Sequence, residues 1–147
     1  MKNTRLSSIL SSTLLASALA IGSLASTQFA SAQSSEIVAK ANIPFAFQTS
    51  RQLLPPGEYL IIQESNHLLR LQGTSKGGFV VTHDATKSHA PTHGSIVFDR
   101  YGDKYYLRQV WTAGNTVGAE CPKSRAEKAN MQAKNEQPSG SFEVAAY

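Results

Sequence analysis

The sequence predicts an all-β protein: a small antiparallel barrel-like roll or sandwich of six to seven strands with a short C-terminal helix. Short alternating apolar segments recur along the chain without helical patterns between them. Gly102-Asp103 separates two of these segments, and Gly-Asp is a hairpin turn signal because glycine accepts a positive φ. Ser124 and Glu127 fit a helix capping box, which predicts a helix from there to about Asn135.

The segment 95–111 is the predicted centre of the sheet. A turn at Gly102-Asp103 pairs Tyr101 with Lys104, and the same register brings Val97 opposite Arg108. One face then collects the core side chains Ile96, Phe98, Tyr105, Leu107 and Trp111. The other face collects Val97, Asp99, Tyr101, Tyr106 and Arg108, and Asp99 lies diagonal to Arg108, where the two can pair across the strands.

Strands are also predicted before this hairpin. Residues 37–47 alternate, with one face formed by Ile37, Ala39, Ala41, Ile43, Phe45 and Phe47. Pro44 lacks an N–H group and places this strand at an edge or a bulge. Residues 58–63 and 67–72 predict a hairpin across Ser65-Asn66, with Leu60 and Ile62 on the core face beside Leu69 and Leu71.

The remaining segments are shorter. A fourth strand is expected at 79–83, an irregular loop at 84–94, and an extended piece at 116–119. Residues 142–147 are either a frayed tail or a final strand. The predicted organisation is thus a leader (1–32), a β domain (33–121), a short helix (122–136) and a tail or edge strand (137–147).

The first 32 residues have the features of a cleaved signal peptide. Lys2 and Arg5 precede an apolar run, and Ala30-Ser31-Ala32 offers small residues where a signal peptidase cleaves. The run contains serines and is shorter than the ~20 apolar residues of a membrane span. The single cysteine, Cys121, cannot be a lipidated N-terminus. We therefore expect an exported protein, periplasmic or extracellular, with no lipid anchor and no transmembrane segment after cleavage.

Charge and cysteine content limit the classes of partner and of stabilisation. Cleavage after Ala32 removes two of the 14 basic residues and none of the 10 acidic ones, so the net charge falls from +4 to +2. A nucleic-acid partner is therefore not expected. One cysteine cannot form an internal disulfide, so stability must come from sheet packing. Cys121 is either buried or free to pair with another molecule, and burial is the commoner state.

Four blocks of residues resemble a known family. They are Ile43-Pro44-Phe45-Ala46-Phe47, Leu54-Pro55-Pro56-Gly57-Glu58-Tyr59, Arg100-Tyr101-Gly102-Asp103 and Pro122-Lys123-Ser124-Arg125-Ala126-Glu127. In this order they resemble a family of small, exported, β-rich hypothetical proteins of soil bacteria. No activity, cofactor or catalytic residue is assigned to that family, so the resemblance implies a fold and no function. The region around Cys121 and the histidine-containing loop depart from the family pattern.

The histidines suggest a metal site. His83, His89 and His93 lie within eleven residues, and imidazole is a common ligand of zinc and copper. A four-residue spacing places His89 and His93 on one face only in a helix, and Pro91 argues against a helix there. The alternative is a polar loop with solvated histidines.

Catalysis has little support in the sequence, and we expect that the protein is not an enzyme and uses no cofactor. There is no Gly-x-Ser-x-Gly elbow and no phosphate-binding Gly-Lys-Ser/Thr pattern before a helix. Cys121 has no histidine near it in the sequence. Glu58, Glu64 and Asp99 are not placed in one cleft by any pattern.

The preferred interpretation is a non-catalytic envelope or extracellular module that binds a macromolecule or its own copies. The partner would be a protein, a cell-envelope glycan or a second copy added at a sheet edge. Tyr101, Tyr106 and Arg108 could form a stacking platform, or could instead cover the hairpin against the terminal helix or a neighbouring sheet. The second interpretation is a carrier of a small hydrophobic ligand inside a barrel lined by Phe45, Phe47, Leu60, Leu69, Phe98 and Trp111, with a solid core as its alternative. The third is the metal site on the loop from His83 to His93.

Overall fold

The computed structural model describes residues 35–134 and 138–147, so the predicted leader at residues 1–32 lies outside the described residues. The described residues form eleven strands and one helix. In chain order these are β1 (Glu36–Ile43), β2 (Phe47–Gln48), β3 (Leu53–Leu54), β4 (Gly57–Ser65), β5 (Leu68–Gly73), β6 (Gly77–Val81), β7 (His83–Thr86), β8 (Gly94–Tyr101), β9 (Lys104–Trp111), β10 (Val117–Glu120), α1 (Arg125–Lys134) and β11 (Gly140–Ala146).

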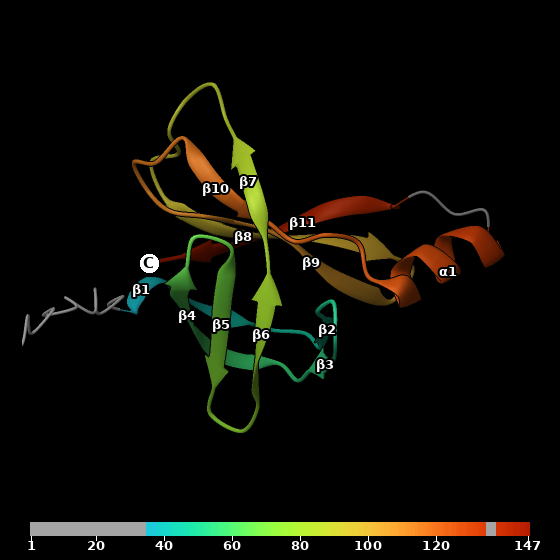
Figure 1. Ribbon diagram of the computed structural model, residues 1–147. Helices are drawn as coiled ribbons and strands as arrows, with labels where there is room; N and C mark the ends of the chain where they lie inside the picture. The colour runs from blue at the N-terminus through green and yellow to red at the C-terminus, as the bar shows by residue number, and fades with distance from the viewer. Residues whose placement is uncertain (1–34, 135–137) are drawn as a thin grey trace, which may run out of the picture. The chain divides into compact units, whose positions relative to one another are not determined.

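The strands form two sheets that share one core (Figure 1). The four-stranded sheet has the order β1-β4-β5-β6, and the other has the order β11-β8-β9-β10-β7. The short strands β2 and β3 pair with each other, and β2 also pairs in parallel with β9. The sheets meet along one side where Lys40 and Tyr147 exchange backbone hydrogen bonds of 2.8 and 3.0 Å. On the other side Thr82 alone separates β6 from β7, so the chain passes directly from one sheet to the other.

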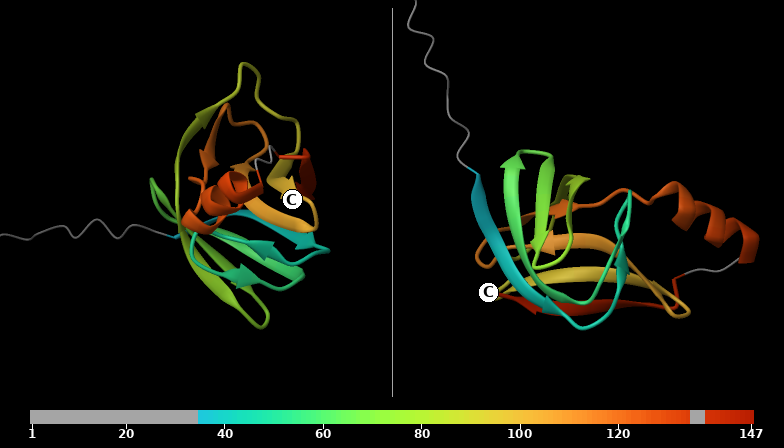
Figure 2. Two further views of the ribbon diagram at one scale, coloured as in Figure 1. Left: turned by 90° about the vertical axis from the view of Figure 1, so that its right-hand side faces the viewer. Right: turned by 90° about the horizontal axis from the view of Figure 1, so that it is seen from below.

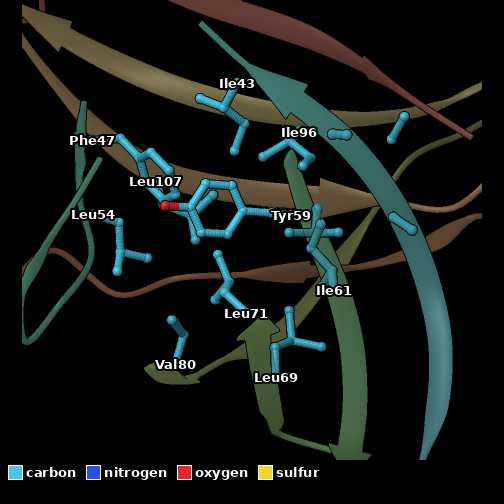
Figure 3. Close-up of a cluster of buried hydrophobic side chains, with 14 of the residues drawn as sticks. Ile43, Phe47, Leu54, Tyr59, Ile61, Leu69, Leu71, Val80, Ile96 and Leu107 are labelled. Atoms are coloured by element: carbon cyan, nitrogen blue, oxygen red, sulfur yellow. The ribbon is translucent and has the colours of Figure 1, made fainter. Parts of the chain in front are cut away.

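The predicted all-β class is confirmed, in its sandwich or roll form and not as a closed barrel. The strands outnumber the predicted six to seven because β2, β3, β7 and β11 are short or were expected as loop or tail. The buried cluster draws on both sheets, as Figure 3 shows for Ile43, Tyr59, Ile61, Ile96 and Leu107. Tyr59 donates its hydroxyl to the Pro55 carbonyl at 2.7 Å, which satisfies its polar end within an apolar core.

The predicted pairing of the central hairpin is confirmed from the turn to the pair Phe98–Leu107. Gly102 has a φ of 60°, and Tyr101 pairs with Lys104 as the turn chemistry predicts. Beyond Phe98–Leu107 the register shifts, because Arg108 is an extra residue that forms a β-bulge. Val97 therefore pairs with Gln109, and the predicted Val97–Arg108 pair is wrong.

The bulge also changes the face of Trp111. Past the extra residue the side-chain alternation changes phase, so Val110 joins Leu107 in the core cluster. Trp111 points to the opposite face, where its indole N–H donates to Gln109 at 3.1 Å and Lys87 lies 4.2 Å above its ring. Trp111 is buried, but its predicted place on the core face is wrong.

The hairpin β4–β5 also turns one residue later than predicted. Ser65 pairs with Leu68, so the loop is Asn66-His67, and a bulge at Glu64 separates this pair from Gln63–Leu69. Tyr59 and Ile61 therefore share the core with Leu69 and Leu71. Leu60 and Ile62 lie on the outer side of the sheet, which corrects the predicted core face.

The first predicted strand is divided in two. Its alternation holds for Ala39, Ala41 and Ile43, which are buried, and the chain leaves the sheet at Pro44 before β2. A bulge at Val38 moves Ile37 to the outer side, opposite its predicted face.

The C-terminal half fits the prediction more closely. Residues 117–120 form β10, and the capping box starts α1 at Arg125. The segment expected as tail or strand is β11, which pairs with β8 from Gly140 to Ala146. No helix of the described residues is long and apolar enough to cross a membrane.

Candidate functional site

The predicted pairing of Asp99 with Arg108 is present and belongs to an ion cluster of Asp99, Arg108 and Glu127, of which Arg108 and Glu127 are buried. Arg108 donates from Nε to Asp99 at 2.7 Å and from a terminal nitrogen to Glu127. Its other terminal nitrogen donates to the Cys121 carbonyl at 2.8 Å. Burial alone would lower the pKa of Arg108, but the two carboxylates outweigh it and the pKa is raised.

The same cluster fixes α1 to the hairpin β8–β9. Glu127 accepts from the Ser124 backbone N–H at 3.3 Å, and Ser124 accepts from the Glu127 backbone N–H at 3.0 Å, as a capping box requires. The Glu127 carboxylate therefore caps its own helix and binds Arg108 of the sheet. The capping role of Glu127 follows from the local sequence, whereas its contact with Arg108 depends on how the helix packs on the sheet.

The remaining members of the predicted platform lie beneath α1. Tyr101 and Tyr106 are 5% and 4% exposed, and their rings meet edge to face with centroids 5.4 Å apart. Tyr101 donates to Glu127 at 3.2 Å, and Tyr106 accepts from Asn130 at 2.9 Å. Burial, reinforced by the charge of Glu127, raises the pKa of Tyr101 to about 12. The structure thus brings Tyr101, Tyr106 and Arg108 together, in the packed arrangement and not as an open platform.

A groove of about 380 Å³ lies beside this face, between β2–β3, the tip of β8–β9 and α1. Its lining includes Leu53, Tyr105, Tyr106 and Asn130. Phe45 stacks on Tyr105 with centroids 3.9 Å apart, and the guanidinium of Arg100 lies 5.7 Å from the Tyr105 ring centroid. Phe45 thus occupies one face of the Tyr105 ring, whereas sugar stacking needs a free aromatic face.

The structure does not gather the three histidines of the predicted metal site into one group of ligands. His83 belongs to β7, while His89 and His93 lie in the loop 87–93, hydrogen-bonded to their neighbours Ser88 and Thr92. Within residues 35–134 and 138–147, no three histidine, cysteine or acidic side chains gather as metal ligands would.

The six side chains predicted to line a ligand pocket do not face one cavity. Phe47, Leu69 and Phe98 are packed in the core cluster, and Phe45 packs against it. Leu60 and Trp111 lie on the outer faces of the two sheets because of the register shifts described above. The space between the sheets at the β7–β10 end is a cavity of about 120 Å³ whose lining includes Thr82, Asp84 and Asn115. The six predicted pocket residues therefore belong to a packed core and to the outer faces of the two sheets.

Cys121 is buried, which is the commoner of its two expected states. Burial raises the pKa of its thiol to about 12. The thiolate, which is the reactive form, is therefore not populated near neutral pH.

The outer side of the four-stranded sheet carries an apolar surface that the predicted register does not contain. Arg70 pairs with Ile62 and Phe79, and Ile62 pairs with Ile37, so one row of side chains crosses all four strands. Together with the neighbouring positions this defines the outer apolar face: Ile37, Leu60, Ile62, Leu68, Phe79 and Val81. Ile37, Phe79 and Val81 are 59%, 51% and 45% exposed.

This face is not covered by any element of the described residues. In the left-hand view of Figure 2 the green strands β4, β5 and β6 form the lower layer, and the yellow and orange strands and α1 lie above them. An antiparallel sheet with one face in water is expected to alternate apolar and polar residues. Here Tyr59-Leu60-Ile61-Ile62 and Phe79-Val80-Val81 are apolar at consecutive positions, and that signal in the sequence indicates two covered faces.

Two ion pairs accompany the outer apolar face. Glu64 accepts from Arg70 Nε, and it also accepts from the Ser35 hydroxyl at 2.7 Å. Lys40 and Glu58 form the second pair, with 3.1 Å between Nζ and Oε1. Hydrogen bonding to Arg70 and Ser35 lowers the pKa of Glu64. The face therefore combines exposed apolar side chains with equal numbers of positive and negative charges.

Comparison with known proteins gives no relative from which a role could be transferred: no protein-family model, no curated protein and no solved structure matches the chain significantly.

Proposed function

We propose that this protein is an exported, non-catalytic β module that works by binding a macromolecule, and that it binds through the outer apolar face. The observation that carries the proposal is the exposure of Ile37, Phe79 and Val81 on one side of the four-stranded sheet. Exposed apolar patches rimmed by charge are typical of protein–protein contact sites.

The polar groups of the protein support a binding role over a chemical one. Arg108 and Glu127 are buried and paired with each other, and Arg108 also pairs with the partly buried Asp99, so these charges hold α1 against the sheet. The Cys121 thiol is buried and protonated at neutral pH. The outer apolar face gathers three exposed large apolar side chains, Ile37, Phe79 and Val81, on one side of a sheet, and such a surface suits association.

Native mass spectrometry of the protein purified from its own host tests this function. We expect a complex with a protein-sized mass that is lost in Phe79→Lys. Val117→Lys is the matched control, because Val117 is 45% exposed on β10, away from this face. A metal or a small ligand as the sole bound species, or equal retention of the complex in both variants, would overturn the proposal.

A further inference from the structure

We infer that the macromolecule bound by the outer apolar face is a second copy of this chain, which forms a twofold-symmetric dimer with the two four-stranded sheets packed face to face. The inference rests on the proposed function, because it names the occupant of the same face. The row Ile37–Ile62–Arg70–Phe79 would be buried at its centre.

The charge pattern favours a copy over an unrelated partner. Arg70 and Glu64 lie side by side on the face, and so do Lys40 and Glu58. A twofold axis that passes between Arg70 and Glu64 sets each Arg70 opposite the partner's Glu64, because a twofold interface brings the same patch together from both copies. A face with no net charge offers no such complement to a strongly acidic or basic surface.

Arg70 can take part without losing its existing contacts. Its Nε donates to Glu64 and one terminal nitrogen donates to Gln72, which leaves donors of the guanidinium for a second carboxylate. Its aliphatic stem lies in the apolar row between Ile62 and Phe79. The side chain is thus fixed along the face before a partner arrives.

The size of the face predicts a weak dimer. Four strands at ~4.8 Å spacing and about seven residues each give roughly 450 Å² per copy, or about 900 Å² in total, near the lower limit for a specific interface. Homodimer interfaces are more apolar than other interfaces, which suits the six apolar positions here. Association should therefore depend on concentration in the micromolar range.

Sedimentation equilibrium of the purified protein from about 1 to about 500 µM tests the inference. We expect the mass to rise from one chain to two. Phe79→Lys should raise the dissociation constant by at least about tenfold, and Val117→Lys should not change it.

Reversing the charge at position 70 or at position 64 is the decisive experiment. Arg70→Glu and Glu64→Arg should each be monomeric, because each brings like charges together across the axis. A 1:1 mixture should recover a heterodimer, since one copy then presents two acidic and the other two basic side chains. Emission of the single tryptophan, Trp111, checks that each variant is folded.

A wild-type protein that stays monomeric throughout this range would overturn the dimer. If Phe79→Lys still abolishes a complex with a different host protein, the proposed function stands and only the identity of the partner is wrong. Equal dimerisation of Phe79→Lys and the wild type would also overturn the inference, because the dimer would then use another surface.

Discussion

Arg108 combines three structural roles in one side chain. It is the extra residue of the β8–β9 bulge, it forms ion pairs with both Asp99 and Glu127, and it donates to the carbonyl of Cys121 before α1. A buried ion pair contributes little net stability over an apolar replacement, but removing one member leaves a buried charge without a partner. The effect of a substitution here should therefore depend on whether the carboxylates are also replaced.

Replacing Arg108 with methionine should lower the free energy of unfolding by about 3–5 kcal/mol, because the buried Glu127 and the partly buried Asp99 would lose their cation. Urea denaturation measures this. Combining Arg108→Met with Asp99→Leu and Glu127→Leu should recover much of the loss. Arg51→Met, at an exposed position, serves as the control and should have little effect. An Arg108→Met protein as stable as the Arg51→Met protein would contradict the assigned role.

At the scale of elements, the strands could be predicted from the sequence, but three of their register shifts could not. Turn chemistry set the pairs next to Gly102 correctly, since a glycine at positive φ is a local requirement. The bulges at Val38, Glu64 and Arg108 depend on long-range packing, and each reverses which side chains face the core beyond it. That is why Trp111 and Leu60 were placed on the wrong faces.

The same register shifts explain why the outer apolar face was not predicted. The outer apolar face exists because Ile37, Leu60 and Ile62 each lie on the side opposite the predicted one. The Asp99–Arg108 pair was predictable because Asp99 lies on the turn side of the bulge and Arg108 is the bulge residue itself, so the register changes only beyond this pair. The sequence does not determine that α1 covers this ion pair, because the capping box specifies where the helix starts and not where it packs.

Strand β10 packs against Trp111 through Gly118. A Cβ at Gly118 would lie 2.5 Å from Cε3 of Trp111, so the glycine lets β10 cover the indole ring. Gly118→Ala should lower the free energy of unfolding by about 1–3 kcal/mol through overpacking. It should also shift the emission of Trp111 to longer wavelength as the ring moves towards water. Gly140→Ala is the control, because nothing lies within 4 Å of its added Cβ. Unchanged emission and stability in Gly118→Ala would refute the contact.

At the scale of the whole described unit, the two sheets depend on a single core. Ala41 and Leu71 of the four-stranded sheet lie in the same buried cluster as Ile96 and Leu107 of the other sheet. The backbone pair of Lys40 with Tyr147 joins the sheets along one side. Loss of either sheet would expose the core of the other, so we expect cooperative unfolding in which groups on different elements contribute to one free energy.

That coupling predicts how stability varies with pH. Burial raises the pKa of the Cys121 thiol and of the Tyr101 hydroxyl, each to about 12, and Glu127 contributes to the shift at Tyr101. From about pH 9 the unfolded chain loses these protons while the folded protein keeps them. The unfolded state then binds fewer protons, so the free energy of unfolding is fully retained below about pH 9 and falls as the pH rises towards 12.

Urea midpoints measured from about pH 8 to about pH 12 test this dependence. Cys121→Ala should remove the part of the decline that begins near pH 9, and Tyr101→Phe the part that begins near pH 10, because ordinary thiols and phenols ionise there. Both changes also cost packing or a hydrogen bond at neutral pH, so the comparison is of slopes and not of absolute stabilities. A stability that rises over this range would mean that the two groups ionise more readily in the folded protein than in the unfolded chain, against the burial that the structure gives them.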